Sequence, residues 1–234
     1  MDERSWERVG AASGLAAAML LVVAFVVAPG APGLDARTAA VVGYLGDRRA
    51  GILTASLLVT LAAVAFLWFV AHLRHVLQRA EGGAEAFSPV VLVSGVSLAT
   101  VCALSMVPLT AMAMLIARPV RVGDIEAVRV LYGVHQLSIG PVGLLVALFA
   151  VSTGAAMVRR ELAGPWLGWA GMAVAVIGLI AGVGSFFAAP SGIVMFLAYV
   201  LGIAFALWIA AASVVMLLRP EVERVTAARG VFAR

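Results

Sequence analysis

Charged residues are scarce in this sequence of 234 residues: they make up 12% of the chain, whereas hydrophobic residues make up 64%. A soluble domain has about a quarter charged residues and about half apolar residues. A chain with so few polar groups cannot cover a surface that faces water, so its solvent must be lipid. The composition excludes an ordinary soluble protein and predicts an integral membrane protein.

The sequence also lacks the residues from which metal centres and most active sites are built. Its single cysteine, Cys102, lies in an apolar run, and one thiol can form neither an internal disulfide nor a four-ligand metal site. The three histidines, His72, His75 and His135, fall at different depths of the predicted helices, so they cannot share a haem iron. The chain contains no H-E-x-x-H, G-x-S-x-G or P-loop motif. We therefore expect no cofactor, no metal and no enzymatic activity.

Asp, Glu and Arg are missing from the interior of the apolar runs, and lysine is missing altogether. Charged groups at membrane depth usually mark ion paths and proton relays, so their absence argues against a pump or a proton-coupled transporter. The arginines are scattered between apolar runs, without the basic stripe that nucleic-acid binding needs. The formal charge of +4 is instead expected from membrane orientation and from contact with anionic lipid. The expected partner is membrane lipid and not nucleic acid.

Six apolar stretches are long enough to cross a bilayer as helices, which takes about 20 residues each. Charges and helix breakers fill the gaps between them, and no gap is long enough to form a soluble domain. We therefore expect one all-α membrane domain over residues 1–234, a bundle of six transmembrane helices. The predicted helices cover residues 9–29, 51–73, 89–117, 128–157, 166–187 and 192–218.

The distribution of arginine predicts that both termini are cytoplasmic, because cytoplasmic loops carry an excess of basic residues. The five tryptophans fall toward the same side, and tryptophan prefers the membrane–water interface. We expect a multi-pass protein of the cell membrane. The inner arginines are Arg4, Arg8, Arg74, Arg79, Arg159, Arg160, Arg219, Arg224, Arg229 and Arg234, and the outer ones are Arg37, Arg48, Arg49, Arg118, Arg121 and Arg129.

Small residues recur along single faces of three predicted helices. In lipid such faces let two backbones approach closely, so we interpret them as helix contacts; a substrate groove is the alternative. Pro108 has no N–H and should free the carbonyl of Leu104, which kinks the helix unless a neighbour compensates. The faces consist of Gly171, Ala175, Gly178 and Gly182; of Ala198, Gly202, Ala206 and Ala210; and of Ser94, Ser97 and Ser105.

The most polar segment that enters the predicted bilayer begins the helix over 128–157. At 100° per residue, Arg129, Tyr132 and Gln136 share one face, and His135 lies about 60° from Tyr132. Arg48 and Arg49 open another helix on the same side. We take these six residues as a candidate site for an anionic or polar group. The alternative is a structural one, with arginine–carboxylate pairs to Asp124 and Glu126 and polar contacts between helices.

Several motifs resemble an uncharacterised family of six-helix membrane proteins that is common in actinobacteria. They are YLGDRR at 44–49, LWF at 67–69 followed by HLRHVLQRAEG, LYGVHQ at 131–136 with Pro141, and PWLGWAG at 165–171. Many members of that family have Asp and Asn where this chain has Gly133 and His135. The resemblance implies the six-helix fold and its topology, and it brings no activity with it.

Two functions of different classes remain. The first is non-catalytic recognition of a ligand, a lipid or a partner, either another membrane protein or a second copy of the chain. The alternative is a transporter or channel for a small neutral or lipophilic solute, which would use the kink at Pro108 and the serine face. A permeation path needs a continuous lumen, whereas a recognition protein should be packed shut. An intramembrane enzyme would need Ser185 within hydrogen-bond reach of His135.

Overall fold

The computed structural model describes residues 3–28, 30–33, 36–81, 86–117, 122–160, 164–187 and 192–218. Within these residues, six helical spans are long and apolar enough to cross a membrane, which is the architecture of a multi-pass membrane protein. Within the described residues the predicted spans are helical over most of their length, and the span over 128–157 is divided in two. Arg118, Arg121 and the four arginines after Leu218 lie outside the described residues. The helices are α1 (Glu3–Val27), α2 (Thr38–Asp47), α3 (Arg49–Glu81), α4 (Ser88–Leu115), α5 (Val122–Leu137), α6 (Ile139–Arg159), α7 (Pro165–Phe187) and α8 (Gly192–Leu218).

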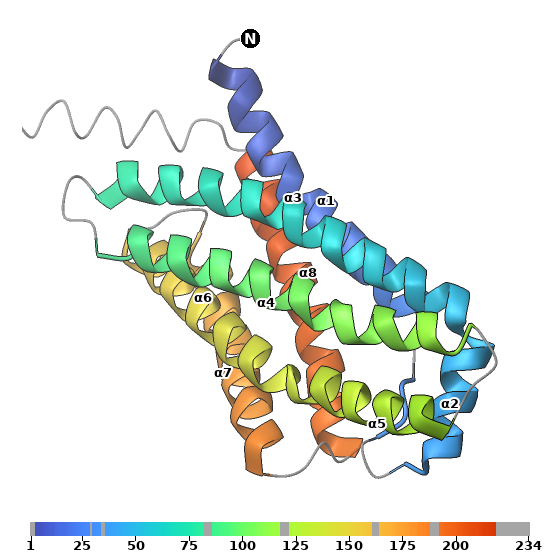
Figure 1. Cartoon of the computed structure of the whole chain (residues 1–234). Helices are drawn as coiled ribbons and strands as arrows, with labels where there is room; N and C mark the ends of the chain where they lie inside the picture. The colour runs from blue at the N-terminus through green and yellow to red at the C-terminus, as the bar shows by residue number, and fades with distance from the viewer. Residues whose placement is uncertain are drawn as a thin grey trace, which may run out of the picture.

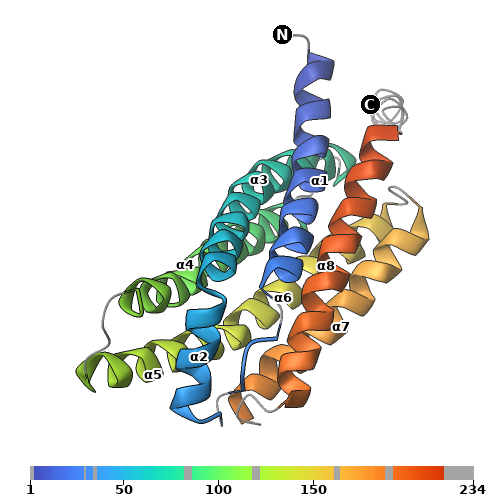
Figure 2. The same cartoon turned by 90° about the vertical axis from the view of Figure 1, so that its right-hand side faces the viewer.

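The six spans form a closed ring (Figures 1 and 2). The order around the ring is α1, α3, α4, α6, α7 and α8, with α8 packed against α1. The start of α1 and the end of α8 lie together at one end of the bundle, which we call the terminal end (Figure 2). The short helix α2 lies at the opposite, distal end, where α5 packs mainly against α4 (Figure 1).

The observed helices are longer than the predicted spans because a helix continues after it leaves the hydrocarbon. Helix α3 runs on past residue 73 to Glu81, through the segment RHVLQRAE, which contains two arginines and one glutamine. These residues have good helix propensity and need water only for their polar heads. Helix α1 likewise begins at Glu3, before the predicted start at residue 9. The sequence therefore located the apolar spans but not the ends of the helices.

The predicted single helix over 128–157 is wrong in one respect, because the chain breaks at Ser138 into α5 and α6. Pro141 explains the break: it cannot donate a hydrogen bond to the carbonyl four residues earlier, and its ring crowds that carbonyl. The hydroxyl of Ser138 donates to the carbonyl of His135 at 2.5 Å. Pro141 lies in the first turn of α6, where a missing N–H costs little.

Helix α2 was not predicted, because the prolines and glycines around it led us to expect an irregular connection. Its apolar residues Val41 and Leu45 are four positions apart and buried, so the helix is amphipathic and packs one face onto the bundle. Arg48 separates α2 from α3, and its backbone N–H donates to the carbonyl of Tyr44.

Aromatic side chains from alternate helices of the ring meet at its centre. Phe66 of α3 lies 5.2 Å from Phe149 of α6 and 5.7 Å from Phe205 of α8, centroid to centroid. Phe149 and Phe205 are 6.1 Å apart, and Trp208 of α8 lies 6.2 Å from each of them. All of these side chains are buried. Because α3, α6 and α8 alternate around the ring, these contacts fill the space between the helices.

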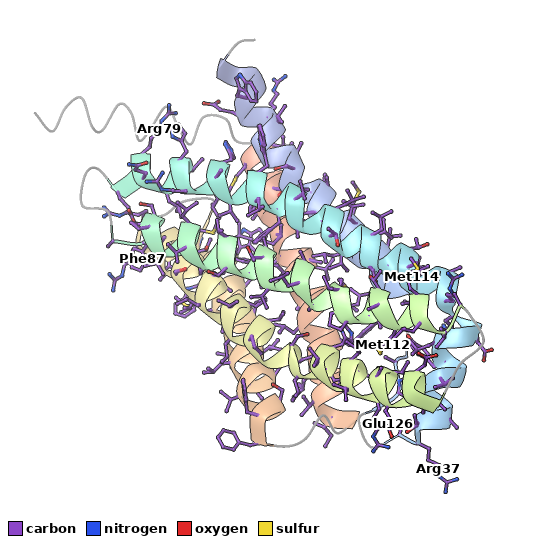
Figure 3. The ribbon with its side chains drawn as sticks, viewed as in Figure 1. Arg37, Arg79, Phe87, Met112, Met114 and Glu126 are labelled. Atoms are coloured by element: carbon purple, nitrogen blue, oxygen red, sulfur yellow. The ribbon has the colours of Figure 1, made fainter. Side chains whose placement is uncertain are left out.

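A second, smaller apolar cluster lies at the distal end. It joins α2 and the first turn of α3 to the end of α4 and to α5, and Met112 lies between α4 and α5 (Figure 3). We call it the distal cluster; its buried members are Val41, Leu45, Ile52, Met112, Ala113, Val128 and Tyr132.

The small-residue faces are helix contacts, as expected for α7 and in part for α8. Gly171, Ala175, Gly178 and Gly182 of α7 are all buried. Gly202 of α8 lies against the ring of Phe25 of α1. The serines on one face of α4 do not use their hydroxyls to contact another helix. Ser94 donates to the carbonyl of Val90 at 2.6 Å, and Ser105 to that of Cys102 at 2.7 Å, so both hydroxyls bond to their own helix.

Candidate functional site

Tyr132 and Gln136 of α5 both point at one backbone carbonyl in the segment between α1 and α2. The amide nitrogen of Gln136 donates to the carbonyl of Pro32 at 3.1 Å and to the hydroxyl of Tyr132, also at 3.1 Å. The Tyr132 hydroxyl itself donates to the same Pro32 carbonyl. Gln136 and Tyr132 are buried. The predicted shared face is correct, and its two buried residues fasten the α1–α2 segment to α5.

His135 lies on the neighbouring face of α5 and contacts α4, in agreement with the predicted 60° offset. Its Nδ1 lies 2.8 Å from the carbonyl oxygen of Ser105. That carbonyl is three residues before Pro108, beside the point where proline removes a helical hydrogen bond. His135 therefore contacts the carbonyl next to that of Leu104, which is the one that Pro108 leaves without its helical donor.

Arg129 extends outward from α5 to the first residue of α2. Its guanidinium donates to the hydroxyl of Thr38 at 3.0 Å, and the side chain is exposed. Arg37, the residue before Thr38, is exposed as well. Arg37, at the N-cap of α2, and Arg129 of α5 therefore place two guanidinium groups on adjoining segments of the distal end, where Figure 3 labels Arg37 and Glu126.

Arg48 and Arg49 are neighbours in sequence but behave differently. The Nε of Arg49 donates to the carbonyl of Ala113 at 2.9 Å, in the last turn of α4, where a cation is favoured by the helix dipole. Arg48 is exposed. Burial raises the pKa of the nearby Tyr44 hydroxyl, and the charge of Arg48 opposes that shift. The arginine–carboxylate pairs to Asp124 and Glu126 in the structural alternative stay a prediction.

The six candidate residues therefore separate into two groups. Tyr132, His135, Gln136 and Arg49 hold backbone carbonyls of other segments and act as structural contacts. Arg48 and Arg129 stay exposed to a ligand. Together with their exposed neighbours they form what we call the distal charged surface, which consists of Arg37, Asp47, Arg48, Glu126 and Arg129.

The pairing that an intramembrane enzyme would need does not form. Ser185 of α7 is buried and donates to the carbonyl of Gly182 in its own helix at 2.7 Å. His135 contacts Ser105 of α4. Each side chain is thus committed to a backbone carbonyl in a different part of the bundle, and a serine nucleophile needs its base in hydrogen-bond reach.

A polar cluster at the terminal end was missed by the sequence analysis. The buried carboxylate of Glu81, the last residue of α3, accepts from the backbone N–H of Phe87 at 2.8 Å and from the Ser88 hydroxyl at 2.9 Å. It thereby caps the N-terminus of α4. Arg159 lies over the Phe87 ring, 5.3 Å from its centroid. The sequence signal that could have predicted this cap was a glutamate shortly before Ser88-Pro89, where an apolar helix begins.

Comparison with models of protein families, with curated proteins and with solved structures found no match. The resemblance to the actinobacterial six-helix family stays a prediction. The residues and their contacts must therefore carry the functional argument.

Proposed function

We propose that this protein is a non-catalytic, multi-pass protein of the cell membrane that recognises an anionic group at its distal charged surface. The group belongs to a ligand, a lipid headgroup or a partner protein. The cytoplasmic position of both termini, which would put this surface outside the cell, is part of the proposal. It follows from the arginine distribution and not from the fold.

The observation that carries the proposal is the contrast between the centre of the bundle and its distal end. The centre is filled by aromatic side chains from α3, α6 and α8. Three exposed arginines, Arg37, Arg48 and Arg129, lie at the distal end, on α5 and at both ends of α2. Arginine binds carboxylate and phosphate groups through its planar fork of N–H donors. A bundle filled at its centre, with accessible arginines at its distal end, supports recognition better than passage.

One observation favours the alternative, a transporter or channel for a small neutral or lipophilic solute. Two helix irregularities lie side by side, because His135, just before the break at Ser138, contacts α4 beside Pro108. Adjacent irregularities of this kind can serve as hinges. An opened state would, however, have to separate Phe66, Phe149 and Phe205. On the serine face of α4, the hydroxyls of Ser94 and Ser105 already bond to their own helix.

The proposal is tested by replacing the two exposed candidate arginines. Arg48→Gln and Arg129→Gln, alone and together, remove charge without disturbing buried contacts. After gentle extraction, native mass spectrometry measures the anionic molecules that stay bound. We expect the double variant to lose bound mass and to keep its thermal stability. Arg8→Gln, at the exposed start of α1, is the matched control and should retain it.

Unchanged retention in the double variant would contradict the proposed site. The alternative is tested separately by glycerol flux into proteoliposomes, measured by light scattering. We expect the same rate with and without the protein. A protein-dependent rate would favour a permeation path and would require the aromatic centre to open.

A further inference from the structure

The end of α7 and the start of α8 present large apolar side chains at the distal end. Phe187, the last residue of α7, is 88% exposed, and Ile193, near the start of α8, is 73% exposed. Phe186 and Phe196 are exposed as well. We call these four residues the hairpin tip. Aromatic and aliphatic side chains of this size are costly to leave in water, because each would lose about 1.5–3 kcal/mol of burial free energy.

Charge is absent from the whole hairpin. No Asp, Glu, Lys or Arg occurs between Glu161 and Arg219, a segment that contains α7, α8 and their connection. The sequences that join the other distal spans carry charges: Asp35, Arg37 and Arg48 between α1 and α3, and Arg118 and Arg121 between α4 and α5. A connection that emerges into water usually needs such groups, so this difference separates the hairpin from the rest of the distal end.

The length of α7 supports the same conclusion independently. Trp169 is exposed near the start of α7, and exposed tryptophans mark the membrane–water interface. Phe187 follows Trp169 by 18 residues, which is about 27 Å of helix at 1.5 Å per residue. The hydrocarbon core of a bilayer is about 30 Å thick. With Trp169 at one interface, Phe187 does not pass beyond the hydrocarbon on the other side.

The exposed apolar face of α7 also continues into the tip without interruption. Val176, Leu179, Ile180 and Val183 are exposed along one side of the helix, at the spacing of a helix face, and Phe186 and Phe187 extend it. In a membrane-spanning helix this face is covered by lipid. Nothing in the pattern changes between the middle of the helix and its end.

We propose that the hairpin tip is immersed in the membrane, where the acyl chains of the lipid cover Phe186, Phe187, Ile193 and Phe196, while the distal charged surface stands in water. The distal end is then divided. Helices α2 and α5 present charge to the aqueous phase, and the hairpin tip stays below the membrane surface as an apolar anchor.

The test places a single fluorophore at defined positions in a Cys102→Ser background. Bimane is attached to Phe187→Cys in bilayers of phosphatidylcholine with brominated acyl chains, and quenching by bromine and by aqueous iodide is measured. Leu179→Cys, exposed in the middle of α7, is the lipid control, and Glu126→Cys, on the distal charged surface, is the water control. Phe196→Cys provides a second position on the tip.

We expect bromine to quench the tip positions nearly as strongly as position 179 and several-fold more strongly than position 126. Iodide should show the opposite order. Tip positions that behave like position 126 would place the hairpin in water and overturn the proposal. Tip positions protected from both quenchers would also overturn it, because the cover would then be protein, for which a second copy of the chain is the first candidate.

Discussion

Helix α6 packs against α7 through close backbone contact at glycines, whereas α5 is held in place by directed hydrogen bonds. Gly143 of α6 lies so close to α7 that an added Cβ would be 2.8 Å from the Cα of Gly182 and 2.9 Å from the carbonyl of Gly178. Helix α5 reaches its neighbours through Arg129, Tyr132, His135 and Gln136. The two segments belong to one apolar span, divided at Ser138.

The difference between α5 and α6 shows two ways to fix a helix in lipid. Close backbone packing gains dispersion contacts over many atoms and tolerates no added volume. Hydrogen bonds to backbone carbonyls fix orientation and register, but each contributes only about 1 kcal/mol. The bundle thus combines a rigid α6–α7 pair with an α5 segment whose position depends on a few polar atoms.

The largest effect is expected at the α6–α7 contact. Gly143→Ala places a methyl group against the backbone of Gly182, which no rotamer change can relieve. We expect a loss of about 2 kcal/mol or more, in the range of overpacked cores, measured by denaturant unfolding in detergent. Gly133→Ala in α5 is the matched control, because its added Cβ meets nothing within 4 Å. It should gain about 0.5–1 kcal/mol from helix propensity. Equal effects at the two glycines would remove the contrast between the segments.

The next largest effect is expected at the shared carbonyl of Pro32. Gln136→Leu removes one buried donor and should cost about 1–2 kcal/mol, and Tyr132→Phe about 1 kcal/mol. The double variant should lose more than either single variant and differ from their sum, because both donors serve one acceptor. Limited proteolysis between residues 28 and 38 should accelerate in the double variant. Unchanged cleavage would show that these contacts do not hold the α1–α2 segment.

A smaller effect is expected where α5 meets α4 beside Pro108. His135→Leu removes the ring nitrogen that contacts the Ser105 carbonyl, at a cost of about 1 kcal/mol in thermal or denaturant unfolding. His75→Leu, at an exposed position of α3, should leave stability unchanged. A neutral or stabilising His135→Leu would mean that α4 satisfies its own carbonyls around the proline.

The smallest effect is expected for Arg129→Gln. Its bond to Thr38 is exposed to solvent, so its loss should change the free energy of unfolding by less than about 0.5 kcal/mol. Thr38→Val removes the same hydrogen bond from the acceptor side and should have an equally small effect. A loss as large as that of Gln136→Leu would place Arg129 among the structural contacts and leave Arg48 alone to support recognition.

The sequence predicted the six spans because length and apolarity alone determine them. It also predicted the shared face of Tyr132 and Gln136, because helical periodicity places residues four apart side by side. It could not predict Pro32 as their acceptor, since the path of a connection is set by tertiary packing. Pro141 was a local signal for the break at Ser138, but the continuous apolarity of the span led us to predict one helix. The Glu81 cap similarly required knowledge of where α3 ends.

The aromatic centre has a consequence for the order of assembly during synthesis. Phe66 and Phe149 belong to helices made early and midway, but Phe205 and Trp208 arrive later with α8, which also closes the ring against α1. Trp208 in addition donates its indole N–H to the carbonyl of Leu167 at 3.0 Å. The nascent chain consequently cannot complete its interior until the ribosome has released α8 to the membrane, and a product truncated before that helix would present an open ring to quality-control proteases.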